Sequence, residues 1–281
     1  MNSGKYNRQI SFFGIDGQKH LESLSVTIVG VGGLGTHVIQ QLAYLGIKKF
    51  SLIDYETVEI SNLNRYVGAK TSDLNQTKVF VAKRIIQEIN SSAEVAVLNK
   101  NLISNEAFQE IIQADSVFGC LDNDGGRVIL NELCQAYKVP YFDLATEIFP
   151  HSTTSYGGRI FITIDETGCI DCYDLIDREL ATFELENSDA QQDIKDIYGL
   201  SNIGYNESGP SVISINGTIA SLAVTEFLVW ATGLRKPQKY LLYRAEQSIV
   251  TINQERVNPD CYYCNEIRGA KDNSGVFEYI R

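Results

Sequence analysis

The segment Gly30-Val-Gly-Gly-Leu-Gly35 constrains the fold of this chain more than any other feature. It overlaps the end of Leu24–Val31, a β-branched and apolar run typical of a buried strand. A helical pattern follows and ends at Gly46, a residue suited to a helix C-terminus. A strand, a glycine-rich turn and a helix in this order are typical of a dinucleotide-binding βαβ unit.

Each glycine of the fingerprint has a physical reason. Gly30 permits the tight turn, Gly32 lets a phosphate approach the backbone, and Gly35 lets the helix pack on the strand. The helix N-terminus offers free N–H groups and a positive dipole to an anion. Asp54, at the end of the next strand pattern, can accept hydrogen bonds from ribose hydroxyls. We therefore predict a nucleotide site that includes Gly33 and leaves NAD and ATP both open.

Strand and helix patterns alternate through the first half of the chain. Strands are expected at 49–54, 94–98, 116–121 and 139–144, and helices at 77–90 and 127–137. This alternation predicts an α/β fold, a Rossmann-like and mainly parallel sheet with helices on both faces. Further strands at 159–164, 240–244 and 249–252, with a helix near 212–232, extend it C-terminally.

No internal repeat or long linker divides the sequence, so residues 1–281 are expected to form one domain. Residues 174–209 are strongly acidic and are expected to form a long inserted loop. Such a charge run is usually a solvated surface segment. A lid over a bound partner is the alternative, because long loops in compact domains are often functional.

Composition excludes several classes of partner and compartment. The net charge of −11 disfavours a nucleic acid, since no basic surface is available for phosphates. The apolar stretch 211–233 contains Asn216 and Glu226, which favours a buried helix over a membrane span. The first residues lack the apolar core of a signal peptide, and six cysteines without a secretion signal suggest a reducing compartment. We expect a cytoplasmic protein.

The residues after the second strand identify a family resemblance. Ile53-Asp-Tyr-Glu-Thr-Val-Glu-Ile-Ser-Asn-Leu-Asn-Arg-Tyr66 resembles the signature of the ThiF/MoeB/HesA superfamily, which includes ubiquitin-activating enzymes. Matching elements occur along most of the chain in the family's order: Tyr6-Asn-Arg-Gln9, the glycine fingerprint, Lys78, Cys120-Leu-Asp-Asn123, Pro140 and two C-x-x-C pairs.

The resemblance implies an ATP site and a role for each matching residue. Asp54 would hold the ribose, Asn62, Arg65 and Lys78 would contact phosphates, and Asp122 would bind Mg²⁺. Arg8 would reach the phosphates from the partner subunit of a homodimer. Cationic groups are needed because a carboxylate that attacks the α-phosphate brings two anions together. Glu56 and Tyr66 depart from the family pattern, which has aspartate and glutamine there.

Two cysteine pairs form a second constellation, Cys169-Ile-Asp-Cys172 and Cys261-Tyr-Tyr-Cys264. Two C-x-x-C pairs can bring four thiolates to one tetrahedral Zn²⁺, and four sulfur ligands leave no open position. A redox dithiol is the alternative, although it explains one pair better than two. We predict a structural zinc site, which in the resembling family ties the C-terminal segment to the body.

The remaining cysteines, Cys120 and Cys134, are expected to be buried packing residues. No cysteine lies between Cys172 and Cys261, where thioester-forming members of the family carry a nucleophile. The resemblance therefore implies an adenylyltransferase without an obvious thioester cysteine. Its substrate would be the C-terminal carboxylate of a small ubiquitin-like or sulfur-carrier protein.

Three other functions remain open at this level. The first is a peptide-adenylating enzyme of the MccB type, and the second is a non-catalytic subunit of a heterodimeric activating enzyme. The third is an NAD-binding protein, a function that would not explain why Arg65, Lys78 and Asp122 occur together.

Overall fold

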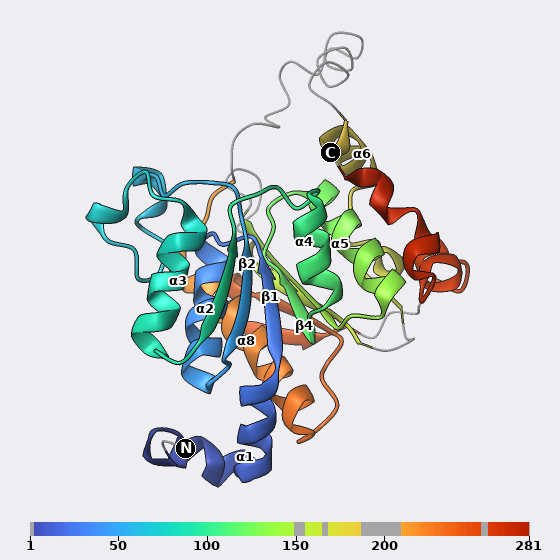
Figure 1. Cartoon of the computed structure of the whole chain (residues 1–281). Coiled ribbons are helices and arrows are strands. Elements are labelled where there is room, and N and C mark those ends of the chain that lie inside the picture. The colour runs from blue at the N-terminus through green and yellow to red at the C-terminus, as the bar shows by residue number, and fades with distance from the viewer. Residues whose placement is uncertain (1–2, 149–154, 165–167, 187–208, 254–257, 281) are drawn as a thin grey trace.

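One sheet of eight strands forms the centre of the computed structural model (Figure 1), which describes residues 3–148, 155–164, 168–186, 209–253 and 258–280. The strand order is β3-β2-β1-β4-β5-β6-β7-β8. The first five strands in this order are parallel, and β6, β7 and β8 are added antiparallel. The strands are β1 (Ser25–Val29), β2 (Lys49–Ile53), β3 (Glu94–Leu98), β4 (Ser116–Gly119), β5 (Tyr141–Ile148), β6 (Tyr156–Thr163), β7 (Tyr240–Arg244) and β8 (Ile249–Ile252).

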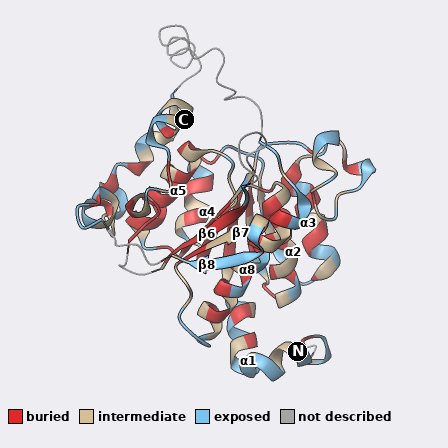
Figure 2. Ribbon diagram, turned by 180° about the vertical axis from the view of Figure 1, so that it is seen from behind, coloured by how far each residue is buried: buried red, intermediate tan, exposed pale blue. Residues whose placement is uncertain are grey.

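Helices cover both faces of the sheet, as expected for parallel strands whose connections cross over it. On one face lie α2 (Gly33–Leu45), α3 (Lys78–Ile89) and α8 (Ile213–Thr232); on the other lie α4 (Asn105–Ile112) and α5 (Asp124–Tyr137). The strands β1, β4, β5 and β6 are largely buried, whereas the edge strand β3 is partly exposed and the edge strand β8 is exposed (Figure 2). The predicted α/β class with a mainly parallel sheet is confirmed.

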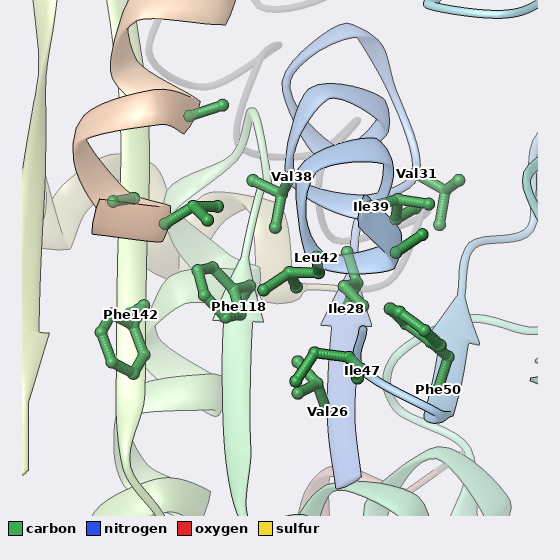
Figure 3. Packing of buried hydrophobic residues seen from close by; sticks show 14 of the residues in the cluster. Val26, Ile28, Val31, Val38, Ile39, Leu42, Ile47, Phe50, Phe118 and Phe142 are labelled. Atoms are coloured by element: carbon green, nitrogen blue, oxygen red, sulfur yellow. The ribbon is translucent and has the colours of Figure 1, made fainter. Parts of the chain in front are cut away.

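Apolar side chains on one face of α2 pack directly against the central strands (Figure 3). Val38 and Leu42 are fully buried, and Phe118 of β4 stacks on Phe142 of β5 with ring centroids 4.8 Å apart. Phe227 of α8 meets the Phe118 ring edge-on at 5.5 Å. This layer fixes the end of α2 that carries the glycine turn relative to the strands.

Most predicted elements are present. The predicted helix end at Gly46 is also confirmed, since this residue adopts the left-handed conformation with φ 99°. Three α-helices were not predicted: α1 (Ser3–Ser23), which contains a kink at Gly14, the short α4, and α6 (Arg178–Leu185). Within the segment expected as a loop, α6 is a capped helix that packs on α5, and residues 187–208 lie outside the described part.

Helix α8 is the one described helix whose length and apolar composition would allow it to cross a membrane. Half of its most apolar window is nevertheless buried inside the protein, against α1, α2, β5 and β6. Glu226 within it is buried and accepts two hydrogen bonds from the Arg235 guanidinium, at 2.6 and 2.7 Å. The helix is part of the core in this structure.

Candidate nucleotide and zinc sites

A pocket of about 1050 Å³ opens at the carboxyl ends of β1, β2 and β4. Parallel strands end at this edge of the sheet, and binding sites of open α/β folds form there. The pocket brings together most of the residues expected to bind the nucleotide: Gly30, Gly32, Gly33, Asp54, Asn62, Arg65, Lys78 and Asp122.

The glycine turn has the geometry that its sequence predicts. Gly30 adopts φ 87°, and a Cβ there would lie 2.5 Å from the Cys120 carbonyl oxygen. A Cβ on Gly35 would lie 2.1 Å from the carbonyl oxygen of Gly30, so helix and turn are in direct backbone contact. A Cβ on Gly32 would meet nothing within 4 Å. The N-cap of α2 is Gly32, which offers no side chain to cap the helix, so within the described residues its first N–H groups remain available to an anion.

Asp54 ties this turn to the next loop. One carboxylate oxygen accepts the Val31 N–H at 2.7 Å, and the other accepts the Glu56 N–H at 2.8 Å. Burial raises the pKa of Asp54, and the nearby Lys78 ammonium partly opposes that shift. The second lone pair of each oxygen can still accept a ribose hydroxyl.

Lys78 is the first residue of α3, and its side chain is only 9% exposed. Its ammonium forms an ion pair with Glu56, and its backbone N–H donates to the Glu56 carbonyl at 2.9 Å. The Tyr66 hydroxyl, buried beneath, donates to the Lys78 carbonyl at 2.8 Å. Lys78 is therefore held at the pocket wall by both residues that depart from the family pattern.

The loop after β2 places Asn62 and Arg65 at the pocket. Asn62 accepts the Glu59 N–H at 3.1 Å, which fixes the short turn at Ile60–Asn62. Arg65 donates to the Ser61 carbonyl at 2.5 Å, and no ion pair to Arg65 is present in the described part of the chain. Its guanidinium can therefore take up an anionic ligand in the pocket.

Asp122 follows β4 and is exposed at the pocket. Among the described residues it accepts one long contact of 3.4 Å from Asn123, whose own side chain caps α5. Burial raises the pKa of Tyr55, and Glu56 and Asp122 add to the shift, so these carboxylates face the same space. A hard cation such as Mg²⁺ prefers such an exposed carboxylate with free oxygens.

Arg8 lies apart from the other expected site residues. It is exposed on α1, which leads directly into the amino end of β1, whereas the pocket lies at the carboxyl ends (Figure 1). The fold therefore does not bring Arg8 to the pocket of its own chain.

The four cysteines of the two C-x-x-C pairs converge, with all sulfur atoms within 4.8 Å of one another. The Sγ atoms of Cys169 and Cys172 are 3.9 Å apart, those of Cys169 and Cys261 are 3.7 Å apart, and those of Cys172 and Cys264 are 3.4 Å apart. Tetrahedral zinc with Zn–S bonds of about 2.3 Å needs separations of about 3.8 Å. The side-chain amide of Asn131 reaches Cys169 Sγ at 3.6 Å, as a donor to a thiolate would. The arrangement fits a structural zinc ion.

Cys134 is buried, as expected, whereas Cys120 is only partly buried and lines the pocket. Burial raises the pKa of both thiols. A thiol with a raised pKa is a poor nucleophile at neutral pH.

The tertiary structure also adds site residues that the sequence did not reveal. Glu184 of α6 accepts the Gly125 N–H at 2.7 Å and lines the pocket. Asp143 is fully buried and receives hydrogen bonds of 2.6 Å from both Arg127 and Arg159. Burial alone would raise the pKa of Asp143, but the two guanidinium groups outweigh it and lower that pKa. No spacing rule connects these residues; only the fold brings them together.

Comparisons of sequence place these observations among known proteins. The profile of the ThiF family matches residues 6–263. The molybdopterin-synthase adenylyltransferase of Escherichia coli is 38% identical over 138 residues, 48% of this chain and 55% of that protein. The adenylyltransferase and sulfurtransferase MOCS3 of Culex quinquefasciatus is 38% identical over the same length, which is 32% of that protein. The sulfur carrier protein ThiS adenylyltransferase of Escherichia coli is 30% identical over 172 residues, 60% of this chain and 66% of that protein.

Solved structures share the fold. Escherichia coli MccB aligns with a TM-score of 0.74 and 21% identity, over 93% of this chain and 75% of that chain. PaaA aligns with a TM-score of 0.66 and 22% identity, over 90% of this chain and 82% of that chain. The segments matched by sequence span about a third to two thirds of the curated relatives, whereas the family profile covers nearly the whole of this chain. The family profile, which the glycine turn and the four-cysteine cluster accompany, shows that the chain belongs to the ThiF family.

Proposed function

We propose that this protein is an ATP-dependent adenylyltransferase that activates the C-terminal carboxylate of a small sulfur-carrier or ubiquitin-like protein. The observation that carries the proposal is the pocket itself, where a free helix N-terminus, Lys78, Arg65 and the exposed Asp122 carboxylate line one space. The curated relatives named as adenylyltransferases support the same reaction. We also propose that the chain acts as a single adenylation domain in the cytoplasm.

The chemistry requires charge compensation and positioning. A carboxylate oxygen of the substrate attacks the α-phosphorus of ATP, the bond to the β-phosphate oxygen breaks, and pyrophosphate leaves with that electron pair. Lys78, Arg65 and the N–H groups of α2 would stabilise the negative charge, with Asn62 as a further phosphate contact. Asp54 would orient the ribose. Asp122 would hold Mg²⁺, which supplies further charge neutralisation when bound.

A groove beside the pocket offers a path for the substrate's terminal segment. It has a volume of about 930 Å³ along β6 and β7, and Asp124, Glu147 and Arg159 line both the groove and the pocket. Six carboxylates and three guanidinium groups line the groove, so its charge is negative on balance. We propose that an extended tail with basic residues lies there and reaches the α-phosphate.

We propose a homodimer in which Arg8 completes the neighbour's site. Three large apolar side chains are exposed on and beside α1: Phe12 at 66%, Ile15 at 41% and Tyr44 at 57%. Tyr44 adjoins α1, because the Gln9 side chain donates to its carbonyl at 3.2 Å. An apolar surface of this kind is suited to burial against a second copy. An arginine supplied across the interface acts only once the site is assembled.

ATP–pyrophosphate exchange tests the reaction. With Mg²⁺ and a small carrier protein ending in Gly-Gly, wild-type protein should exchange label between pyrophosphate and ATP, and exchange should vanish without the carrier. Asp122→Ala should abolish exchange. Glu94→Ala is the matched control, because Glu94 is an exposed carboxylate at the amino end of β3 and does not line the pocket. Normal exchange by Asp122→Ala would remove this residue from the mechanism.

The same assay separates the alternatives. Exchange that depends on a short peptide, and never on a folded carrier, would favour a peptide-adenylating enzyme instead. If no carboxylate substrate supports exchange although ATP binds, the protein is a non-catalytic subunit. Binding of NAD in place of ATP would contradict the adenylyltransferase proposal as a whole.

A further inference from the structure

Glu56 and Tyr66, the two departures from the family signature, contact the same residue. Glu56 pairs with the ammonium of Lys78, and Tyr66 donates a hydrogen bond of 2.8 Å to its carbonyl. The backbone contact between Lys78 N and Glu56 O at 2.9 Å and the bridge between Thr57 and Thr77 hold the two segments side by side. Both departures from the family signature therefore contact Lys78.

Lys78 needs a carboxylate partner in the nucleotide-free protein. Its side chain is 9% exposed, and a buried ammonium without a partner is strongly unfavourable. Its place at the start of α3 adds to the problem, since a helix N-terminus repels positive charge. The Asp54 carboxylate is nearby, but its oxygens accept the Val31 and Glu56 N–H groups. Glu56 is the carboxylate in direct contact with the ammonium.

The two members of this pair differ in their freedom to move. The Glu56 side chain is 52% exposed, so its carboxylate can turn into water with little loss of solvation. The Lys78 side chain is enclosed and lines the pocket, so the ammonium stays where an anionic ligand would meet it. An incoming phosphate and the Glu56 carboxylate would compete for one ammonium.

We infer that Glu56 is a positioning residue that holds the Lys78 ammonium in the free enzyme and releases it to the phosphates of ATP. The inference rests on the proposed function, since it takes ATP as the ligand of this pocket. Glu56 thereby keeps the Lys78 ammonium in place at the expense of ATP affinity. Removing its charge should strengthen nucleotide binding, the opposite of what loss of an ordinary binding residue does.

Titration calorimetry with Mg²⁺ and ATP, without acyl substrate, tests this. Glu56→Gln should lower the Kd for ATP about three- to fivefold, as expected for loss of a competing, partly exposed ion pair. Glu56→Asp keeps the charge and should stay within about twofold of wild type. Glu88→Gln is the matched control: Glu88 is 55% exposed on the same helix, pairs with Arg84 at 3.0 Å, and its loss should leave the Kd unchanged.

Lys78→Met decides whether the effect passes through Lys78. In that background, adding Glu56→Gln should change the Kd for ATP by less than about 1.5-fold. An unchanged or raised Kd in folded Glu56→Gln, or an equal gain without Lys78, would overturn the inference. Glu56→Ala serves as a second neutral variant if Glu56→Gln does not fold. Failure of the wild type to bind ATP would instead overturn the proposed function, and the inference with it.

Discussion

Two glycines of the same turn, Gly32 and Gly35, should separate protein stability from ligand binding. Gly35→Ala places a methyl group 2.1 Å from the Gly30 carbonyl oxygen, whereas real contacts of this kind stay above 3.0 Å. The backbone must therefore move by about 0.9 Å at the junction of turn and helix. Gly32→Ala meets nothing within 4 Å, and its φ of −86° and ψ of −158° are open to any L-residue.

The expected magnitudes follow from these contacts. Gly35→Ala should destabilise the nucleotide-free protein by about 3 kcal/mol, the upper part of the range for overpacking, because a carbonyl cannot rotate away like a side chain. For a chain of this size that lowers Tm by roughly 6–12 °C. Gly32→Ala should leave the Tm unchanged or raise it slightly, because alanine restricts the unfolded chain. Its methyl group extends into the pocket that Gly32 lines, so ATP affinity should fall.

Thermal unfolding by circular dichroism and ATP titration calorimetry, applied to both variants, measure the two effects. Each variant should change a different property: Gly35→Ala should lower the stability of the protein, and Gly32→Ala should weaken ATP binding at wild-type stability. A wild-type Tm for Gly35→Ala would refute the packing argument. Wild-type ATP affinity for Gly32→Ala would show that phosphate does not approach the backbone at this position.

Three further predictions concern the cysteine cluster, the half-buried His37 and the partner subunit. Cys264→Ser should reduce zinc below about one ion per chain by atomic emission and lower the Tm, whereas Cys134→Ala, also a buried cysteine, should leave the zinc content unchanged. Burial lowers the pKa of His37 below 6.5, and a backbone hydrogen bond with Ile213 opposes this shift more weakly. The unfolded chain therefore binds the proton more readily than the folded protein, so stability should fall as the pH drops through about 6.5. His37→Gln should flatten the change in Tm between about pH 7.5 and 5.5, while His20→Gln at an exposed position should not; equal slopes would contradict the assignment. Arg8→Ala and Asp122→Ala homodimers should both be inactive. A heterodimer of the two variants has one site that lacks both groups and one site that lacks neither, so mixing them should restore about half of the wild-type exchange activity per heterodimer. If mass spectrometry confirms subunit exchange and no activity returns, Arg8 does not act across the interface.

The local sequence was sufficient to predict most of the elements around the pocket. In the helix that begins at Gly33, apolar residues recur with the helical period, and Gly46 marks its C-terminus. The neighbouring strands are short runs of apolar residues. Helix α4 was missed although Ser104 caps it and Ala107, Phe108 and Ile111 form its buried face. Its eight residues make little more than two helical turns, too few for the apolar pattern to distinguish a helix from a loop. The long α1 was missed because Gly14 interrupts its pattern.

Chemistry-bearing residues were predictable from sequence where a motif fixes their spacing. The glycine turn and the two C-x-x-C pairs are such cases, because neighbouring residues along the chain are neighbours in space. Closure of the four-cysteine cluster already needed the fold, since the two pairs are separated by 92 residues at Cys169 and Cys261.

Only the tertiary structure decided how charges pair around the site. The contact of Glu56 with Lys78 joins positions 22 residues apart, and the buried Asp143 joins Arg127 and Arg159 from different elements. Sequence patterns report burial and period, which are properties of one segment. Ion pairs depend on where separate segments meet, and on how much water remains between them. The position of Arg8 also depends on the tertiary structure: α1 leads into the amino end of β1, whereas the pocket of the same chain lies at the carboxyl ends of the strands.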